Sequence, residues 1–416
     1  MRVTDFVLDG TLRSDGASIH EVRGNHFKLT LGRVPQPTMA TAELSPDVRK
    51  HYPGRQEGWA NWVRFEIARN ARGNELRLDV EFEAPEEWGR FRSPKEGGVP
   101  YPFTSYDPCW SYDGEEWQYI SWEDDFVPGR SGTLIFPPFE GDRVLVCTQL
   151  PMTVGDAEAL LAEWREHPHV EVHILGESLG GRKLHRVTIT NPQGDVPRSR
   201  RWVHHVANQH PGEGVSQWYV AGMVKWFLSE EAAEARSRTI GHFTLMMNPD
   251  GVDNGWCRVN AQGIDSNRNF RVEGSDPALQ PHEAYIFQRD LESLVRSDAP
   301  VATSWAMHSS PSAKLSPMLV GRGPELRGVL APDEAFGALL KEHDPMGLIN
   351  DYREHHRGVT PECFWDGGPH HAWGITTFLV EGGGKGMNKP RAIEAGGILM
   401  RALTEYYAGE RDQLGE

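Results

Sequence analysis

The sequence is poor in cysteine, and its few cysteines are not grouped. Four cysteines occur among 416 residues, and no two of them form a Cys-x-x-Cys pair, which excludes a paired-cysteine motif. Free thiols are typical of a reducing compartment, so we expect a cytoplasmic protein. The amino terminus, MRVTDFVLDG, has no basic start followed by an apolar stretch, and no secretory signal is expected. The cysteines are Cys109, Cys147, Cys257 and Cys363.

Long apolar runs and an excess of positive charge are also missing. No apolar run approaches the roughly 20 residues that a membrane span needs, so no membrane partner is expected. The chain has 43 Lys and Arg residues against 59 Asp and Glu, a formal net charge of −16. Such acidity argues against nonspecific binding to nucleic acid or to an anionic membrane surface.

The first part of the chain has the pattern of a β-sheet protein. Residues 62–68 (WVRFEIA) and 76–82 (LRLDVEF) alternate apolar and polar side chains, and residues 70–74 (NARGN) are typical of a turn between them. Residues 143–148 (RVLVCT) indicate another short strand. We therefore expect an antiparallel β-sandwich domain over residues 1–152.

The pattern changes after Pro151, where strands and helices begin to alternate. Residues 156–166 predict a helix with Ala159, Leu160 and Trp164 on its apolar stripe. Further segments indicate an α/β domain with a mixed central sheet over residues 153–416. The expected strands are residues 170–175, 184–190, 201–207, 242–247, 301–307 and 375–380, and the expected helices are 215–228 and 285–295.

Gln209-His210-Pro211-Gly212-Glu213 stands where an expected strand ends and a buried helix begins. A His and a Glu three residues apart across such a turn can converge on one metal ion. Catalytic zinc takes three protein ligands from the His and Glu set and leaves one position open for water. Glu213 would also lie at a helix N-terminus, where a carboxylate is favoured.

Three more elements follow in order. Residues 248–251 (NPDG) precede Arg258, and residues 265–270 (DSNRNF) come next. Buried arginines near a metal can polarise a carbonyl or grip a carboxylate. His308 and Glu381 each end an apolar strand, and strand ends are where ligand-binding groups collect in α/β sheets.

This order of motifs resembles the zinc carboxypeptidase family, in its cytosolic carboxypeptidase-like branch. The HPGE form of the metal motif is that of the branch, and residues 176–190 are similar to the entry strands of its catalytic domain. Residues 281–284 (PHEA) are similar to the helix start ahead of the third ligand. The N-terminal strands, with residues 106–117, are similar to the β-sandwich that precedes the catalytic domain.

The resemblance implies a role for each matching residue. His210, Glu213 and His308 would hold one zinc ion. Glu381 would be the general base and proton shuttle, and Arg258 would polarise the substrate carbonyl. The pair that binds the terminal carboxylate of a peptide or protein substrate would be Asn267 and Arg268, with Ser309 as a further substrate contact.

Several points stay open at the level of sequence. Ala306-Met307 precedes His308 where the branch often has Asp-Leu, so the second hydrogen-bond partner of the ring must come from elsewhere. Tyr352 is the only tyrosine near the place of a mobile-loop tyrosine. Eukaryotic members of the branch remove glutamates, whereas Asp366, upstream of Glu381, would favour a C-terminal Lys or Arg.

Two other functions are compatible with part of the pattern. A metal-dependent amidase or deacylase of N-acyl amino acids would share the HxxE motif, the later His and an Asn-Arg pair. The NPDG turn followed by Arg258, and the N-terminal sandwich, favour the peptidase. A non-catalytic binding protein that keeps the fold would have no need for Glu381 beside the metal.

Overall fold

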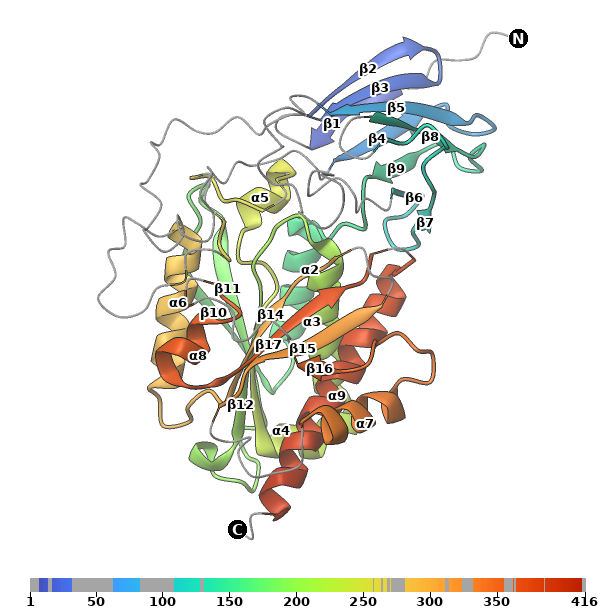
Figure 1. The fold of residues 1–416 in the computed structure, drawn as a ribbon. Coiled ribbons are helices and arrows are strands. Elements are labelled where there is room, and N and C mark those ends of the chain that lie inside the picture. Colours follow the sequence, from blue (N-terminus) through green and yellow to red (C-terminus); the bar gives the residue numbers. More distant parts are fainter. Residues whose placement is uncertain are drawn as a thin grey trace.

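The computed structural model describes most of the chain in segments (Figure 1). Among the described residues, the strands form three sheets, and no helix combines the length and apolarity that crossing a bilayer requires. The described residues are 7–13, 17–31, 63–82, 108–127, 131–256, 258–262, 265–267, 270, 281–310, 314–323, 332–354, 362, 364–384 and 386–413.

Two small sheets make up the N-terminal part of the chain. Their inner faces share one apolar cluster, to which Leu29, Ile67 and Leu78 contribute fully buried side chains. Among the N-terminal residues that the structure describes, β3 and β5 pair in parallel and the other strand pairs are antiparallel, so the expected antiparallel sandwich is confirmed with one parallel pair. One sheet has the order β1 (Val7–Arg13), β4 (Arg64–Arg69), β9 (Val144–Cys147), β6 (Cys109–Ser111) and β7 (Gln118–Tyr119), and the other β2 (Ala17–Arg23), β3 (His26–Leu31), β5 (Leu76–Phe82) and β8 (Ser131–Phe136).

The turn expected at residues 70–74 connects two strands that are not neighbours. Asn70 and Gly73 have positive φ angles of 69° and 75°, as tight turns often require. However, β4 and β5 belong to different sheets, so this turn carries the chain from one layer of the sandwich to the other.

The C-terminal part contains an eight-stranded sheet with both parallel and antiparallel pairs, as the sequence predicts. Its centre is parallel, with β12 between β13 and β14 and with β17 beside β14. Antiparallel pairs join β10, β11 and β13 at one side and β15 to β17 at the other. The order is β10 (Val170–Glu177), β11 (Lys183–Ile189), β13 (Thr239–Thr244), β12 (Trp202–Asn208), β14 (Thr303–Met307), β17 (Thr376–Gly382), β15 (Leu315–Gly321) and β16 (Arg353–Glu354).

Helices cover both faces of this sheet (Figure 1). Apolar side chains of α2, α3, α7 and α9 form one cluster with the sheet, and those of α6 form another with Trp365 and Trp373. The helices are α2 (Val154–Arg165), α3 (Gly214–Leu228), α4 (Ala233–Arg238), α5 (Pro249–Asn254), α6 (His282–Val295), α7 (Pro332–His343), α8 (Gly368–Trp373) and α9 (Lys389–Gln413), with short 3-10 turns at η2 (Arg198–Arg200) and η3 (Glu230–Ala232).

Helices α3 and α9 touch through their backbones. A Cβ atom on Gly222 of α3 would lie 2.0 Å from the carbonyl oxygen of Ile393 in α9, so only glycine fits there. This close approach fixes the long C-terminal helix against the buried helix that follows the HPGE motif.

The apolar stripe of α2 agrees with the predicted one at Trp164 and differs at Ala159. Ala157, Leu161 and Trp164 are buried, whereas Ala159 is exposed and Leu160 is only partly covered. The helix begins at Val154 because Thr153 caps it, and the Thr153 hydroxyl accepts a hydrogen bond from the Asp156 N–H. The buried stripe therefore starts at Ala157 and continues through Leu161 and Trp164.

Two adjacent histidines of β12 generate a prediction about stability and pH. His204 and His205 have exposed fractions of 0% and 2%, and burial lowers the pKa of each from its ordinary value to about 3. Both rings are neutral in the folded protein, whereas the unfolded chain takes up their protons below about pH 6.5. Stability is therefore full above that pH and falls as the pH drops. Between pH 7.5 and 5.5 we expect a loss of about 1 to 1.5 kcal/mol per ring.

Urea unfolding of metal-free protein at the two pH values measures this loss. His204→Gln removes one titrating ring, so the pH-dependent loss should shrink by about 1 to 1.5 kcal/mol. If His204→Gln loses as much unfolding free energy between the two pH values as the wild-type protein does, then His204 does not contribute to the pH dependence.

Candidate metal centre

The ends of the parallel strands bring the predicted metal residues to one edge of the sheet. His210 follows β12 by two residues, and His308 comes directly after β14. The His308 N–H donates to the carbonyl oxygen of Val380 in β17 at 2.8 Å, next to Glu381. Glu213 is the N-cap residue of α3.

The side chains of His210, Glu213 and His308 converge. Glu213 Oε1 lies 2.8 Å from His210 Nδ1, and Glu213 Oε2 lies 2.9 Å from His308 Nδ1. The two Nδ1 atoms are 3.0 Å apart. All three residues are buried, and one ligand atom from each lies within 4.8 Å of the others. Two imidazole nitrogens and a carboxylate are a donor set that suits catalytic zinc.

The charges at this cluster favour a bound cation. Burial would raise the pKa of Glu213, but His210 and His308 outweigh burial and hold it below its ordinary range. Burial would likewise lower the pKa of His308, but Glu213 raises it above its ordinary value. Further negative charge at Glu381 and Asp366 acts on His308 in the same direction. The surrounding carboxylates thus stabilise positive charge at the point where the ring nitrogens meet.

Asp265 joins this cluster to Arg258, and the sequence analysis gave it no role. Asp265 Oδ1 lies 2.9 Å from His210 Nε2, while Oδ2 accepts from Arg258 Nε and Nη2 at 3.1 and 3.0 Å. A carboxylate on Nε2 keeps the proton there and leaves the Nδ1 lone pair for a metal. The signal was present in the sequence, since a ligating His ordinarily has a carboxylate or carbonyl partner and Asp265 opens the DSNRNF motif.

Arg258 points toward the metal residues. Its guanidinium is held by Asp265, and its Nη1 atom lies 3.7 Å from Glu213 Oε1. The side chain is largely buried, with 18% of its surface exposed.

Asn267 contacts His308 in this structure. Its Nδ2 atom is 3.2 Å from His308 Nε2, and its Oδ1 accepts from the Trp365 N–H at 2.6 Å. An amide NH₂ group only donates, so this contact does not supply the acceptor that the His308 ring needs if it binds a metal through Nδ1. Arg268, predicted to bind substrate together with Asn267, lies outside the described residues.

Glu381 and Ser309 lie beside the cluster. Burial raises the pKa of the Glu381 carboxyl to about 7; His308 opposes this shift and Glu213 adds to it. A carboxyl with a pKa near neutrality is suited to general acid–base chemistry. The Ser309 N–H donates to Glu213 Oε2 at 3.3 Å, which helps to orient that carboxylate.

The segment before α2 packs directly behind the HPGE turn. The Gln149 side-chain amide donates to the carbonyl oxygen of Gly212. A Cβ atom on Gly214 would lie 2.4 Å from the Leu150 carbonyl oxygen, so this segment leaves no room for a side chain at the start of α3. Trp218 Nε1 donates to the Pro151 carbonyl oxygen at 2.8 Å. Residues 149–152 therefore pack against the HPGE turn and the start of α3; we call this segment the rear wall of the turn.

Tyr352 belongs to the core. Its ring lies edge-on to Phe336 of α7 at 5.0 Å and 6.4 Å from Phe378. Only 7% of the residue is exposed. The tyrosine considered for a mobile loop thus helps to pack α7 against the sheet.

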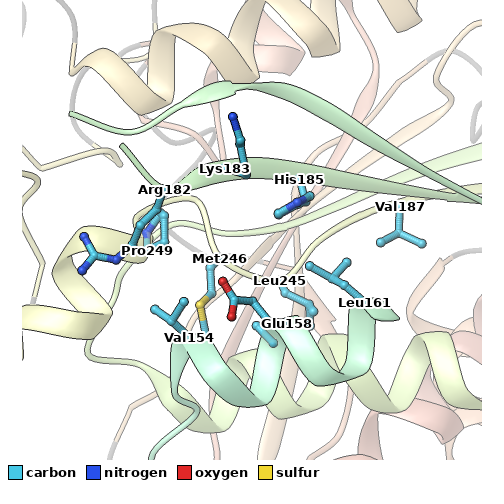
Figure 2. Close-up of a pocket in the computed structure, with 11 residues that line it drawn as sticks. Val154, Glu158, Leu161, Arg182, Lys183, His185, Val187, Leu245, Met246 and Pro249 are labelled. Carbon is cyan, nitrogen blue, oxygen red and sulfur yellow. The ribbon is translucent and has the colours of Figure 1, made fainter. Parts of the chain in front are cut away.

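A small cavity between α2, β11 and the start of α5 is separate from the metal cluster (Figure 2). Its volume is about 40 Å³, enough for a few water molecules. None of the three metal residues lines it. The lining consists of Val154, Ala157, Glu158, Leu161, Arg182, Lys183, His185, Val187, Leu245, Met246 and Pro249.

Comparison with known proteins identifies the central region. Residues 158–306 match the family model Peptidase_M14, described as zinc carboxypeptidase. Cytosolic carboxypeptidase 2 of Danio rerio is 32% identical over 147 residues, which are 33% of this chain and 20% of that protein. An uncharacterised protein of Zymomonas mobilis is 28% identical over 218 residues, 52% of this chain and 51% of that protein. The match therefore spans between a fifth and about half of these relatives' lengths.

Solved structures show that the likeness of fold extends over nearly the whole chain. A metallo-carboxypeptidase from Burkholderia cenocepacia matches with a TM-score of 0.69 and 20% identity, covering 98% of this chain and 100% of that one. A putative carboxypeptidase from Burkholderia mallei matches with a TM-score of 0.71 and 18% identity, covering 98% of each chain. At these identities the comparison establishes the fold, with the N-terminal sheets included.

Asp265 generates a prediction about metal binding. Asp265→Asn removes the charge that holds the proton on His210 Nε2, so zinc should bind about 10- to 100-fold more weakly. Competition with a chromogenic chelator measures the affinity. Asp253→Asn is the matched control, because Asp253 pairs with Arg182 and does not touch the metal cluster. Equal zinc affinity in both variants would contradict the role given to Asp265.

Proposed function

We propose that the chain is a zinc-dependent carboxypeptidase, because residues 158–306 match the family model described as zinc carboxypeptidase. It would hydrolyse the C-terminal peptide bond, or a side-chain glutamyl bond, of peptide or protein substrates. The observation that carries the proposal is the convergence of His210 Nδ1, His308 Nδ1 and the Glu213 carboxylate at one sheet edge, with Glu381 beside them.

The donor set fits one zinc ion. His210, Glu213 and His308 would hold it and leave a position open, as catalytic zinc requires. The bound ion would supply Lewis-acid polarisation of the substrate carbonyl and a lowered pKa for water. The free cysteines and the relatives' names favour a cytoplasmic location.

The residues around the metal would divide the remaining work. Glu381 accepts a proton from the attacking water and delivers it to the leaving amine. Arg258 donates hydrogen bonds to the oxygen on which negative charge develops. Asn267 and Arg268 bind the substrate's terminal carboxylate, and Ser309 is a further substrate contact. To bind substrate, Asn267 would give up part of its contacts with His308 and the Trp365 backbone N–H.

Two side-chain preferences are compatible with this chemistry. The resemblance to the cytosolic carboxypeptidase-like branch, whose eukaryotic members remove glutamates, implies an acidic substrate. Asp366 favours a basic one, because it is buried and its charge acts on both His308 and Glu381. Digestion of a peptide library ending in Glu, Lys or Arg, analysed by mass spectrometry, distinguishes them. Cleavage of N-acyl amino acids without cleavage of longer peptides would indicate the amidase instead, and binding without turnover would indicate the binding protein.

The general base is tested by Glu381→Gln. Glutamine keeps the size of the side chain but cannot accept the proton of water. We expect turnover to fall by roughly two to four orders of magnitude while zinc content stays unchanged. Steady-state kinetics and metal analysis on the same preparation measure both quantities. Near wild-type turnover would contradict the assigned mechanism.

Recognition of the terminal carboxylate is tested by Arg268→Ala and by a C-terminal amide. Removing one side of a buried charged pair costs about 2–5 kcal/mol, or roughly 30- to several-thousand-fold in affinity. Arg268→Lys should also be impaired, because lysine lacks the planar pair of donors. Capping the peptide as an amide should cause a comparable loss in the wild-type enzyme, and the two defects should not multiply.

The control for this test is Arg143→Ala, which removes an arginine that pairs with Glu66 in the N-terminal sheets. It should leave the preference for a free carboxylate unchanged. Wild-type enzyme that cleaves free-acid and amidated peptides equally well would exclude a carboxypeptidase.

A further inference from the structure

Glu283 is a buried carboxylate that lies outside the metal cluster. It stands in the first turn of α6, where the helix dipole favours negative charge, and none of its surface is exposed. Its Oε1 accepts from the Leu179 N–H at 3.2 Å, and its Oε2 accepts from Asn260 Nδ2 at 2.8 Å. Glu283 thus connects the tip of the β10–β11 hairpin to the segment that carries Arg258.

That segment, residues 258–262, is held from both sides. Asn260 is 2% exposed, and its Oδ1 accepts from the Gln262 N–H at 3.0 Å. Because its Nδ2 donates to Glu283, both ends of the amide are bound and its orientation is fixed. On the other side, Asn248 Nδ2 donates to the Val259 carbonyl oxygen at 2.8 Å. The backbone next to Arg258 is therefore fixed by two side chains from different elements.

The hairpin that Glu283 binds is itself anchored. Asp250, at the start of α5, accepts from Ser178 Oγ at 2.8 Å and from the Gly180 N–H at 2.7 Å. Arg182 donates to the same carboxylate at 2.7 Å, and Figure 2 shows Arg182 beside Pro249 where α5 begins. The hairpin tip therefore bridges α5 and α6, and Glu283 binds a rigid frame on one side and the Arg258 segment on the other.

We propose that Glu283 is a positioning residue for Arg258 and acts through Asn260. This rests on the proposed function, in which the Arg258 guanidinium must lie within hydrogen-bond distance of the reacting carbonyl. Only Val259 lies between Arg258 and Asn260, so a shift of the Asn260 amide also moves the backbone that carries the guanidinium. A displacement of about 1 Å at such a group can cost 100-fold in rate.

Glu283→Gln tests the proposal. Glutamine can still accept from Leu179, but its NH₂ group then faces the Asn260 amide NH₂. We expect kcat to fall roughly 10- to 100-fold, with KM and zinc content changed far less. Glu292→Gln is the matched control, because Glu292 is also a buried carboxylate of α6 and pairs with Arg289 and Arg296. Its activity should stay close to wild type, and equal losses in the two variants would overturn the proposal.

A double-mutant cycle with Arg258→Ala separates positioning from general stability. If Glu283 acts through Arg258, then Glu283→Gln should cost little more once Arg258 is alanine. Full multiplication of the two losses would overturn the proposal. Should Glu283→Gln fail to fold, Asn260→Ala supplies the same cycle from the other side of the hydrogen bond.

Amide hydrogen exchange keeps this test independent of the proposed function. In Glu283→Gln, exchange should accelerate in the peptide that contains residues 258–262, but not in that variant's α9. If exchange is faster in Glu283→Gln but the wild-type protein cleaves no peptide, then the contact of Glu283 with the Arg258 segment is supported and the carboxypeptidase proposal is rejected. An active wild-type enzyme with unchanged exchange in the variant would reject the positioning role alone.

Discussion

The arrangement of the site depends on the carboxylate of Asp265. Asp265 binds His210 with one oxygen and Arg258 with the other, so the orientation of the imidazole and the position of the guanidinium are set by the same group. The Asn267 N–H donates to Asp265 Oδ1 at 2.8 Å, which also ties the following residues to this carboxylate. His210, Arg258 and the start of the DSNRNF motif are therefore all oriented by the same carboxylate.

The surrounding fold keeps the side chains of this cluster in place. The parallel strands bring His210 and His308 to one edge, and the buried helix α3 presents Glu213 from its N-terminus. Because α3 and α9 meet at Gly222 without side chains between them, α3 has little freedom to slide or rotate. The convergence of the His210, Glu213 and His308 side chains is thus supported by tight packing at a distance from them.

Short motifs with strong chemical requirements could be predicted from the sequence, and contacts between distant segments could not. The HPGE turn and His308 were recognisable because metal ligands restrict residue type and spacing. The partnership of Asn267 with His308 depends on a contact across 41 positions of the chain, which no local pattern encodes. Likewise, alternation predicted β4 and β5 but not their separate sheets, and Tyr352 resembled a loop residue until its contacts with Phe336 were known.

The rear wall at residues 149–152 has a consequence for how the chain can be divided. The family match begins at residue 158, so a gene fragment cut there would encode the recognised domain without Gln149, Leu150 and Pro151. Such a fragment would remove the hydrogen-bond partners of the Gly212 carbonyl and the Trp218 indole. A fragment that keeps both contacts must therefore begin upstream of the part that sequence similarity marks.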